Sequence, residues 1–288
     1  VYDGELYLEL HRGTLTAKQQ IKKNNRMAEN LLRMLELCLT RSAVTARTPA
    51  DGTALRPLWN TLLVNQFHDI LPGSCIAAAN DRSLHDMAEM LHAGSELLRS
   101  WFAPAQNCYT VLNPLDEPCR DVFYLPQIAS GFIAQEPGVT LQNVVLADGT
   151  AATAVYGLER PALGAAVLHF VPGEQPAQTS RFVYDGKTLT TPLLQVQLDE
   201  LGRITSLVTR ADGMQWTDGP MNTLLMAEDV SAGWDGWDID ADCMMKLQPA
   251  ARLTKQTVTA DGPQEFRLHS RYELGTATIL SLIHISEP

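Results

Sequence analysis

The stretch "NQFHDILPGSC", Asn65 to Cys75, separates two helical patterns in the first third of the chain. An apolar run with helical spacing leads into it, and Pro57 suits the first turn of that helix. The Pro-Gly pair inside the stretch cannot comfortably continue a helix, so we expect the helix to end near His68 and Asp69. Ser74 is a suitable N-cap for a further helix.

A third helical pattern precedes these two. Thr14 or Thr16 can cap it, and its apolar residues recur at helical spacing as far as Leu39. The linker "SAVTARTPADGT" then breaks the pattern with Pro and Gly. Three amphipathic helices of this kind bury their apolar stripes against one another, so we expect a small bundle. Residues 1–10 alternate polar and apolar residues as a strand does.

After Pro104 the pattern changes to short runs bounded by Pro, Gly, Asn and Asp. The clearest hairpin is "LLQVQLDELGRITSLV", in which Asp199 and Gly202 occupy the first and fourth positions expected of a type I turn. The stretch "FRLHSRYEL" is a second strand signal. Many short strands without intervening helices predict an antiparallel sandwich, so the fold class is α + β with several domains.

The composition narrows the classes of protein. A formal net charge of -11 over 288 residues argues against nucleic-acid binding, which depends on positive charge to displace counterions from phosphates. Five widely spaced cysteines without a CxxC pair fit a reducing compartment, so we expect a cytoplasmic protein. No apolar run approaches the roughly 20 residues that span a bilayer, so a membrane partner is not expected.

Both ends of the chain have unusual sequences. The chain opens on "VYDGELYLEL" without Met, so its natural start is expected to lie further upstream. The last nine residues, "LSLIHISEP", resemble the translated end of a sequencing adapter, and we expect residues 280–288 not to be natural protein. The alternative is a short terminal β-strand.

His68 and Asp69 form the first candidate site. Successive residues of a helix point about 100° apart, but at a helix end both side chains can face one pocket. A neutral imidazole is a common metal ligand, and a carboxylate accepts hydrogen bonds from sugar hydroxyls. The alternative is structural, because a histidine near a helix C-terminus interacts favourably with the helix dipole.

Two further stretches carry polar and aromatic residues suited to binding. "LELHRGT" places His11 and Arg12 where a strand gives way to a helix, although Arg12 could equally be a solvated surface residue. "WDGWDID" holds two tryptophans and three aspartates in seven residues, including Trp237 and Asp238. Aromatic faces stack on sugars, and carboxylates accept bonds from sugar hydroxyls. The alternative is a packed β-loop with its tryptophans in the core.

Taken in order, five stretches resemble the α-mannosidases of glycoside hydrolase family 38, in their bacterial and cytosolic-type branch. They are "GELYLELHRGTLTAKQQIKKNNRMAENLL", "LWNTLLVNQFHDILPGS", "LNPLDEPCRDVFYLP", "LDELGRITSLV" and "WDGWDID". The resemblance implies a zinc-dependent retaining exo-α-mannosidase. In such enzymes one aspartate attacks the sugar and a second protonates the leaving oxygen.

The resemblance also implies roles for the candidate residues. His68 is expected to be a zinc ligand, and Asp69 is expected to contact the mannose. His11 and Arg12 match an "HR" step expected to face the same pocket, and Trp237 with Asp238 match a region near the substrate. The other zinc ligands, both catalytic aspartates and the rest of their domain are expected outside this chain, so residues 1–288 alone are expected to be inactive.

The resemblance divides the chain into four parts. Residues 1–12 are expected to be the tail of an α/β catalytic domain, 13–105 a three-helix middle domain, and 106–279 an incomplete, galactose-mutarotase-like β-sandwich region, followed by residues 280–288. A mannose-containing oligosaccharide is the expected partner, and a homo-oligomer of the intact enzyme is compatible with the resemblance. Two alternatives remain, a non-catalytic carbohydrate-binding or assembly module and a family hydrolase acting on phosphorylated mannosyl compounds.

Overall fold

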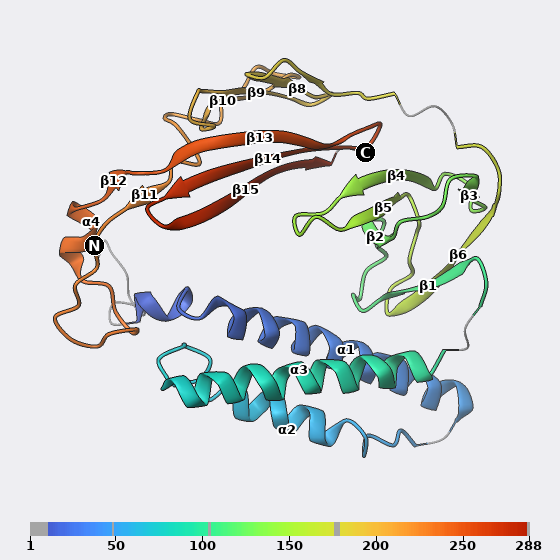
Figure 1. Ribbon diagram of the computed structural model, residues 1–288. Coiled ribbons are helices and arrows are strands. Elements are labelled where there is room, and N and C mark those ends of the chain that lie inside the picture. Colours follow the sequence, from blue (N-terminus) through green and yellow to red (C-terminus); the bar gives the residue numbers. More distant parts are fainter. Residues whose placement is uncertain (1–10, 48, 103–104, 176–178, 287–288) are drawn as a thin grey trace.

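A helical layer lies beside several antiparallel sheets in the computed structural model, which describes residues 11–47, 49–102, 105–175 and 179–286 (Figure 1). The helices are the 3-10 helix η1 (Arg12–Leu15), α1 (Gln19–Ala46), α2 (Arg56–Asn65), α3 (Ala77–Ser100) and α4 (Ala241–Met245). None of the helices in these described ranges is both long and apolar enough to cross a bilayer. The strand expected over residues 1–10 falls outside the described residues.

The strands follow the helical layer in the chain, and every pairing given between them is antiparallel. They are β1 (Cys108–Asn113), β2 (Phe123–Pro126), β3 (Phe132–Ala134), β4 (Thr140–Val145), β5 (Ala151–Tyr156), β6 (Gly164–Pro172), β7 (Val183–Tyr184), β8 (Thr188–Thr190), β9 (Leu194–Leu198), β10 (Ile204–Thr209), β11 (Leu225–Met226), β12 (Gln248–Pro249), β13 (Arg252–Asp261), β14 (Glu265–Leu274) and β15 (Ala277–Ser286). The α + β class expected from the sequence is therefore confirmed.

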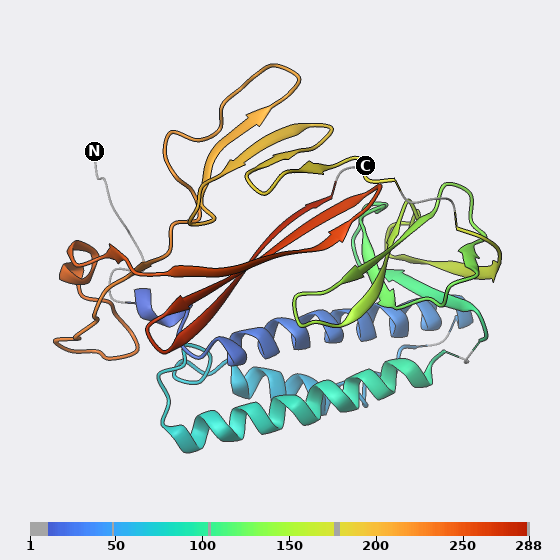
Figure 2. The ribbon, with the colours of Figure 1, turned by 45° about the horizontal axis from the view of Figure 1, so that its top comes forward.

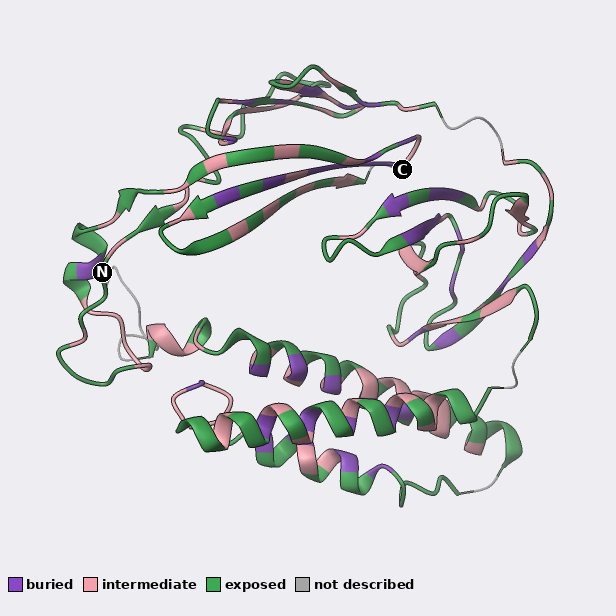
Figure 3. Cartoon of the chain, in the orientation of Figure 1, coloured by how far each residue is buried: buried purple, intermediate pink, exposed green. Residues whose placement is uncertain are grey.

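The three long helices pack against one another because each carries an apolar stripe. Their common core consists of Ala28, Leu32, Leu35, Leu55, Leu58, Leu62, Met87 and Met90. Pro57 lies in the first turn of α2, as the sequence predicted. Figure 3 shows that the outward faces of these helices are mostly exposed, which is the pattern of amphipathic helices.

The predicted caps were wrong for two of the helices. α1 begins after Lys18, which has a left-handed backbone (φ 52°), and the Thr14 hydroxyl donates to the carbonyl of His11 instead. α3 begins after Ile76 without a side-chain cap. The Ser74 hydroxyl is used elsewhere, as described below. α2 ends at Asn65, three residues before His68, because residues 66–73 form tighter turns.

Leu62 provides a test of the helical core. It is fully buried in α2, whereas its neighbour Leu63 is 58 % exposed. We expect Leu62→Ala to lower the free energy of unfolding of the helical layer by about 2–5 kcal/mol, because the substitution removes buried methyl groups and leaves a cavity. Leu63→Ala is the matched control and should change it by less than about 0.5 kcal/mol. Urea unfolding followed by circular dichroism measures both, and equal effects would contradict this packing.

The sheets lie above the helices in two further layers (Figure 2). The sheet with strand order β10-β9-β8-β7 packs on the sheet β13-β14-β15, and their shared core contains Phe182, Leu189, Val196, Leu198, Phe266 and Leu268. The predicted hairpin is confirmed as β9 and β10. At its turn the Gly202 amide donates to the Asp199 carbonyl over 3.0 Å, and the Asp199 carboxylate accepts from two amides of the same turn.

Glu265 joins the β13-β14-β15 sheet to the sheet formed by β2, β5 and β4. It is fully buried, and its carboxylate accepts hydrogen bonds from the hydroxyls of Tyr124 (3.0 Å) and Tyr156 (2.7 Å). Burial alone would raise its pKa, but bonds from His284 and Tyr156 and the charge of Arg267 lower the pKa of Glu265 to about 2. The carboxylate therefore stays ionised and holds the two sheets in one arrangement.

Candidate functional site

His68 and Asp69 lie in a tight turn directly after α2. The Ile70 amide donates to the Phe67 carbonyl over 2.9 Å and the Gly73 amide to the Ile70 carbonyl over 2.9 Å, and these three-residue spacings are tighter than those of an α-helix. The His68 ring packs against the Phe67 ring, with centroids 4.2 Å apart. The His68 side chain is 69 % exposed, and its Nε2 lies 3.5 Å from Asp69 Oδ2. The two side chains therefore approach each other at the surface of one turn.

Ser74 fixes the orientation of the Asp69 carboxylate. Its hydroxyl donates to Asp69 Oδ1 over 3.0 Å. The other carboxylate oxygen, Asp69 Oδ2, lies beside the His68 imidazole. This arrangement leaves the histidine nitrogen and one carboxylate oxygen accessible for a ligand, which a helix-dipole role for His68 would not require.

The loop around Trp237, from the β-rich part of the chain, packs against the segment of His11 and Gly13. The His11 ring contacts the edge of Trp237, with centroids 5.3 Å apart and an interplanar angle of 75°. The Gly13 amide donates to the Trp237 carbonyl over 2.9 Å. A Cβ at Gly13 would lie 3.3 Å from the carbonyl oxygens of residues 236 and 238, so glycine allows this close approach.

The Trp237 loop also passes close to the His68–Ser74 turn. A Cβ on Gly236 would lie 3.8 Å from Ser74, the residue that holds Asp69. Segments 11–13, 68–74 and 234–240 thus meet at one end of the helical layer, near the start of α1 (Figure 1). We call this meeting point the three-segment junction. It brings together candidate residues that are as far apart in sequence as His11 and Trp237.

The remaining candidates occupy the edges of the junction. Arg12 opens η1 and is half-buried. Asp238 Oδ1 accepts from the Ile239 amide over 2.8 Å, so one of its oxygens stabilises its own loop. Trp234 is 76 % exposed, which rules out a core position for it, while Trp237 is half-buried against His11.

Sequence reasoning missed Lys22, whose ammonium lies behind the His68–Ser74 turn. It donates to the carbonyls of Ala17, Leu71 and Pro72. Burial lowers the pKa of Lys22. No sequence signal separates it from the adjacent Lys23, which is exposed.

A histidine and two carboxylates also come together on α3. In the described part of the chain, one group brings three metal-binding side chains close together, those of His85, Asp86 and Glu89. His85 already pairs with Glu89, and Asp86 with Arg82 one turn away. Such exposed pairs at helical spacing stabilise a helix surface.

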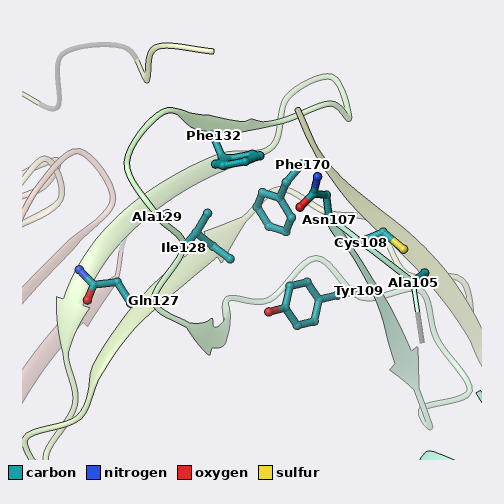
Figure 4. Close-up of a pocket in the computed structure, with 9 residues that line it drawn as sticks. All are labelled: Ala105, Asn107, Cys108, Tyr109, Gln127, Ile128, Ala129, Phe132 and Phe170. Atoms are coloured by element: carbon teal, nitrogen blue, oxygen red, sulfur yellow. The ribbon is translucent and has the colours of Figure 1, made fainter. Parts of the chain in front are cut away.

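A cavity of about 330 Å³ opens at the opposite end of the molecule from the junction. Figure 4 shows the rings of Tyr109, Phe132 and Phe170 around it, with Ile128 between them. Tyr109 and Phe170 meet edge to face, 5.9 Å between centroids. None of the candidate residues lines this cavity, so it is separate from the junction.

Comparison with known proteins connects this fold to a family of carbohydrate-active enzymes. Residues 9–103 match the "Alpha mannosidase middle domain", and residues 189–287 match the "Glycosyl hydrolases family 38 C-terminal domain". Two solved structures from Enterococcus faecalis share the fold with a TM-score of 0.60 each, a family 38 protein at 10 % identity and an α-mannosidase at 11 %. They overlie 96 % of this chain, which covers 42 % and 40 % of theirs.

The chain belongs to glycoside hydrolase family 38. It is similar to the human protein named "Alpha-mannosidase 2C1", with 32 % identity over 251 residues. It is also similar to a yeast (Saccharomyces cerevisiae) α-mannosidase, with 42 % identity over 79 residues, which are 26 % of this chain and 7 % of the yeast protein. The human alignment covers 82 % of this chain and 22 % of the human protein, so the chain spans about a fifth of that relative.

Proposed function

We propose that this chain is part of a zinc-dependent, retaining exo-α-mannosidase that removes terminal α-mannose from oligosaccharides. One observation carries the proposal. The three-segment junction lies where the two matched family domains meet, with His11 and His68 in the first and Trp237 in the second. Substrate sites occur preferentially at domain interfaces.

In this proposal each junction residue has a chemical role. The exposed imidazole of His68 binds the metal, and Asp69 Oδ2, the oxygen that Ser74 does not hold, accepts a hydrogen bond from a mannose hydroxyl. The half-buried Trp237 offers an aromatic surface beside the sugar, supported by His11. Arg12 and Asp238 lie at the same junction. The catalytic aspartates are supplied from outside residues 1–288.

The donor set fits zinc in kind but is incomplete within the described residues. Imidazole nitrogen and carboxylate oxygen are both zinc ligands, and a catalytic zinc takes three ligands from protein. His68 offers one such group, because Asp69 is assigned to the sugar, and the group of three on α3 includes neither of them. The remaining ligands must therefore come from outside the described residues. A bound zinc would supply Lewis-acid binding of sugar hydroxyls.

The proposal extends to the domains. The helical layer is the family's three-helix middle domain over residues 13–105. The sheets over 106–279 are the beginning of its galactose-mutarotase-like β-sandwich region. The common core of α1, α2 and α3 and the packing of β7–β10 on β13–β15 support this division.

The direct test compares the full-length enzyme with residues 1–288 alone. We expect the full-length enzyme to hydrolyse an aryl α-mannoside with retention of anomeric configuration, to lose activity with a chelator and to regain it with zinc. Residues 1–288 alone should show no turnover, because they lack both catalytic aspartates. Turnover by this chain alone, or full-length activity that survives complete removal of metal, would refute the proposal.

A non-catalytic sugar-binding module is the second candidate, favoured by the exposed Trp234 beside Trp237. In that case the full-length protein would bind mannosides without hydrolysing them. Tryptophan fluorescence titration with mannose, run beside the turnover assay, separates the two candidates.

A further inference from the structure

Lys22 lies at the point where the start of α1 meets the His68–Ser74 turn. A lysine ammonium has three donor hydrogens and no acceptor. Three carbonyls receive them, that of Ala17 from the segment before α1, and those of Leu71 (2.8 Å) and Pro72 (3.0 Å) from the turn. One side chain therefore connects two backbone segments about 50 positions apart, as the separations of 49 and 50 for its two turn contacts record.

Placing the charged ammonium of Lys22 in a half-buried position costs free energy, which its hydrogen bonds must offset. Lys22 is half-buried, and all three of its bonds go to neutral carbonyls. A charged group that leaves water without an opposite charge must recover its hydration through hydrogen bonds. Three carbonyls arranged around one ammonium do so only if the turn stays in its present position.

Gly73 allows the turn to pack closely against the segment before α1. Its backbone has φ +87°, a conformation that favours glycine. A Cβ at this position would lie 2.8 Å from Lys18 Cγ and 2.9 Å from the Ala17 carbonyl oxygen, so any other residue would push the turn away from the start of α1. The Ala17 carbonyl thus accepts from Lys22 and also lies where a side chain at position 73 would have to fit.

The anchored segment leads directly to the candidate ligands. Pro72 and Gly73 are followed by Ser74, whose hydroxyl holds Asp69 Oδ1 at 3.0 Å. Asp69 Oδ2 in turn lies 3.5 Å from His68 Nε2. Movement of the Leu71–Pro72 carbonyls would therefore change the position of both side chains.

We propose that Lys22 is a positioning residue, whose ammonium clamps the turn onto the start of α1 and so sets the orientation of His68 and Asp69 at the three-segment junction. The inference rests on the proposed function, because it needs this pair to bind the metal and the sugar. Lys22 itself touches neither. Its effect on the reaction passes through the backbone of the turn.

Substitution of Lys22 in the full-length enzyme tests this role. Lys22→Met keeps the length of the side chain but removes its donors, and we expect about 10-fold or greater loss of zinc affinity, the size found for groups that orient metal ligands. The d–d absorption of the cobalt(II)-substituted enzyme should shift, because the ligand geometry changes. Lys22→Arg keeps the charge and the donors, so it should restore part of the zinc affinity and bring the cobalt absorption back toward that of the wild type. Lys23→Met, at the exposed neighbouring position, is the matched control and should behave as wild type.

Gly73→Ala provides an independent variant, because it displaces the same turn without altering Lys22. It should reproduce the cobalt spectrum of Lys22→Met, which keeps the test valid if Lys22→Met does not fold. Zinc affinity, cobalt spectrum and kcat/KM equal to those of Lys23→Met, in either folded variant, would overturn the proposal.

Failure of the clamp and failure of the proposed function give different results. If His68→Ala loses its metal while Lys22→Met keeps it, only the clamp is wrong. If His68→Ala keeps its metal, the proposed metal site is wrong. Hydrogen exchange over residues 68–74 then tests whether Lys22 holds the turn in place. Faster exchange in Lys22→Met than in Lys23→Met supports the clamp, and equal exchange overturns it.

Discussion

His68→Ala in the full-length enzyme should lower zinc affinity by more than about 100-fold, because residues that only orient a metal ligand already cost about 10–100-fold. Activity toward an aryl α-mannoside should fall with the metal content. The physical reason is that His68 presents an exposed imidazole at the junction, 3.5 Å from a carboxylate whose other oxygen is held by Ser74. Metal content by mass spectrometry and kcat/KM, measured on the same preparation, check both effects.

The control for this prediction is His92→Ala, which removes an exposed histidine from α3, away from the junction. It should keep metal and activity. Full zinc occupancy in His68→Ala would exclude His68 as a ligand. Equal losses in both variants would point to general damage to the helical layer.

The second large effect is expected for Asp69→Asn, which keeps the shape of the side chain and removes its charge. A hydrogen bond to a charged group contributes about 1.5–3 kcal/mol. Since about 1.4 kcal/mol is a factor of ten, kcat/KM for a mannoside should fall roughly 10–100-fold. Zinc content should change much less than in His68→Ala, because the proposed partner of Asp69 is the sugar.

Asp81→Asn on the exposed surface of α3 is the matched control, and it should leave kcat/KM unchanged. Kinetics with mannosides, together with zinc analysis, separate the two roles. If Asp69→Asn lost its zinc as fully as His68→Ala, Asp69 would be a metal ligand rather than a sugar contact. Unchanged kinetics would remove it from the site.

Apolar spacing predicted the α + β class, the long helices and some of the strands. It located the three long helices, the β9–β10 hairpin with its Asp199–Gly202 turn, and the strand β14, in which Phe266 and Leu268 are buried. The predicted helix caps were wrong because a cap is predicted from the position of a hydroxyl in the sequence, whereas the partner of that hydroxyl depends on the turn around it. Thr14 and Ser74 instead bond to His11 and Asp69, partners that their turns present.

The candidate site was only partly predictable. The sequence identified its residues through motifs, and the structure places His11 against Trp237 and Asp69 against Ser74. Whether His68 and Asp69 bind metal and sugar stays a prediction. Lys22 could not be found, because its contacts reach 49 and 50 positions along the chain, and Lys23 beside it has the same chemistry without them. Long-range backbone contacts of this kind leave no local pattern.

The most direct test of the account is to locate the metal in crystals of the full-length enzyme by anomalous scattering at the zinc edge. The account predicts one strong peak about 2.0–2.1 Å from a ring nitrogen of His68, the distance of a zinc–imidazole bond, with Asp69 beside it. A zinc ion bound elsewhere, with the His68 ring left in solvent, would contradict the central claim.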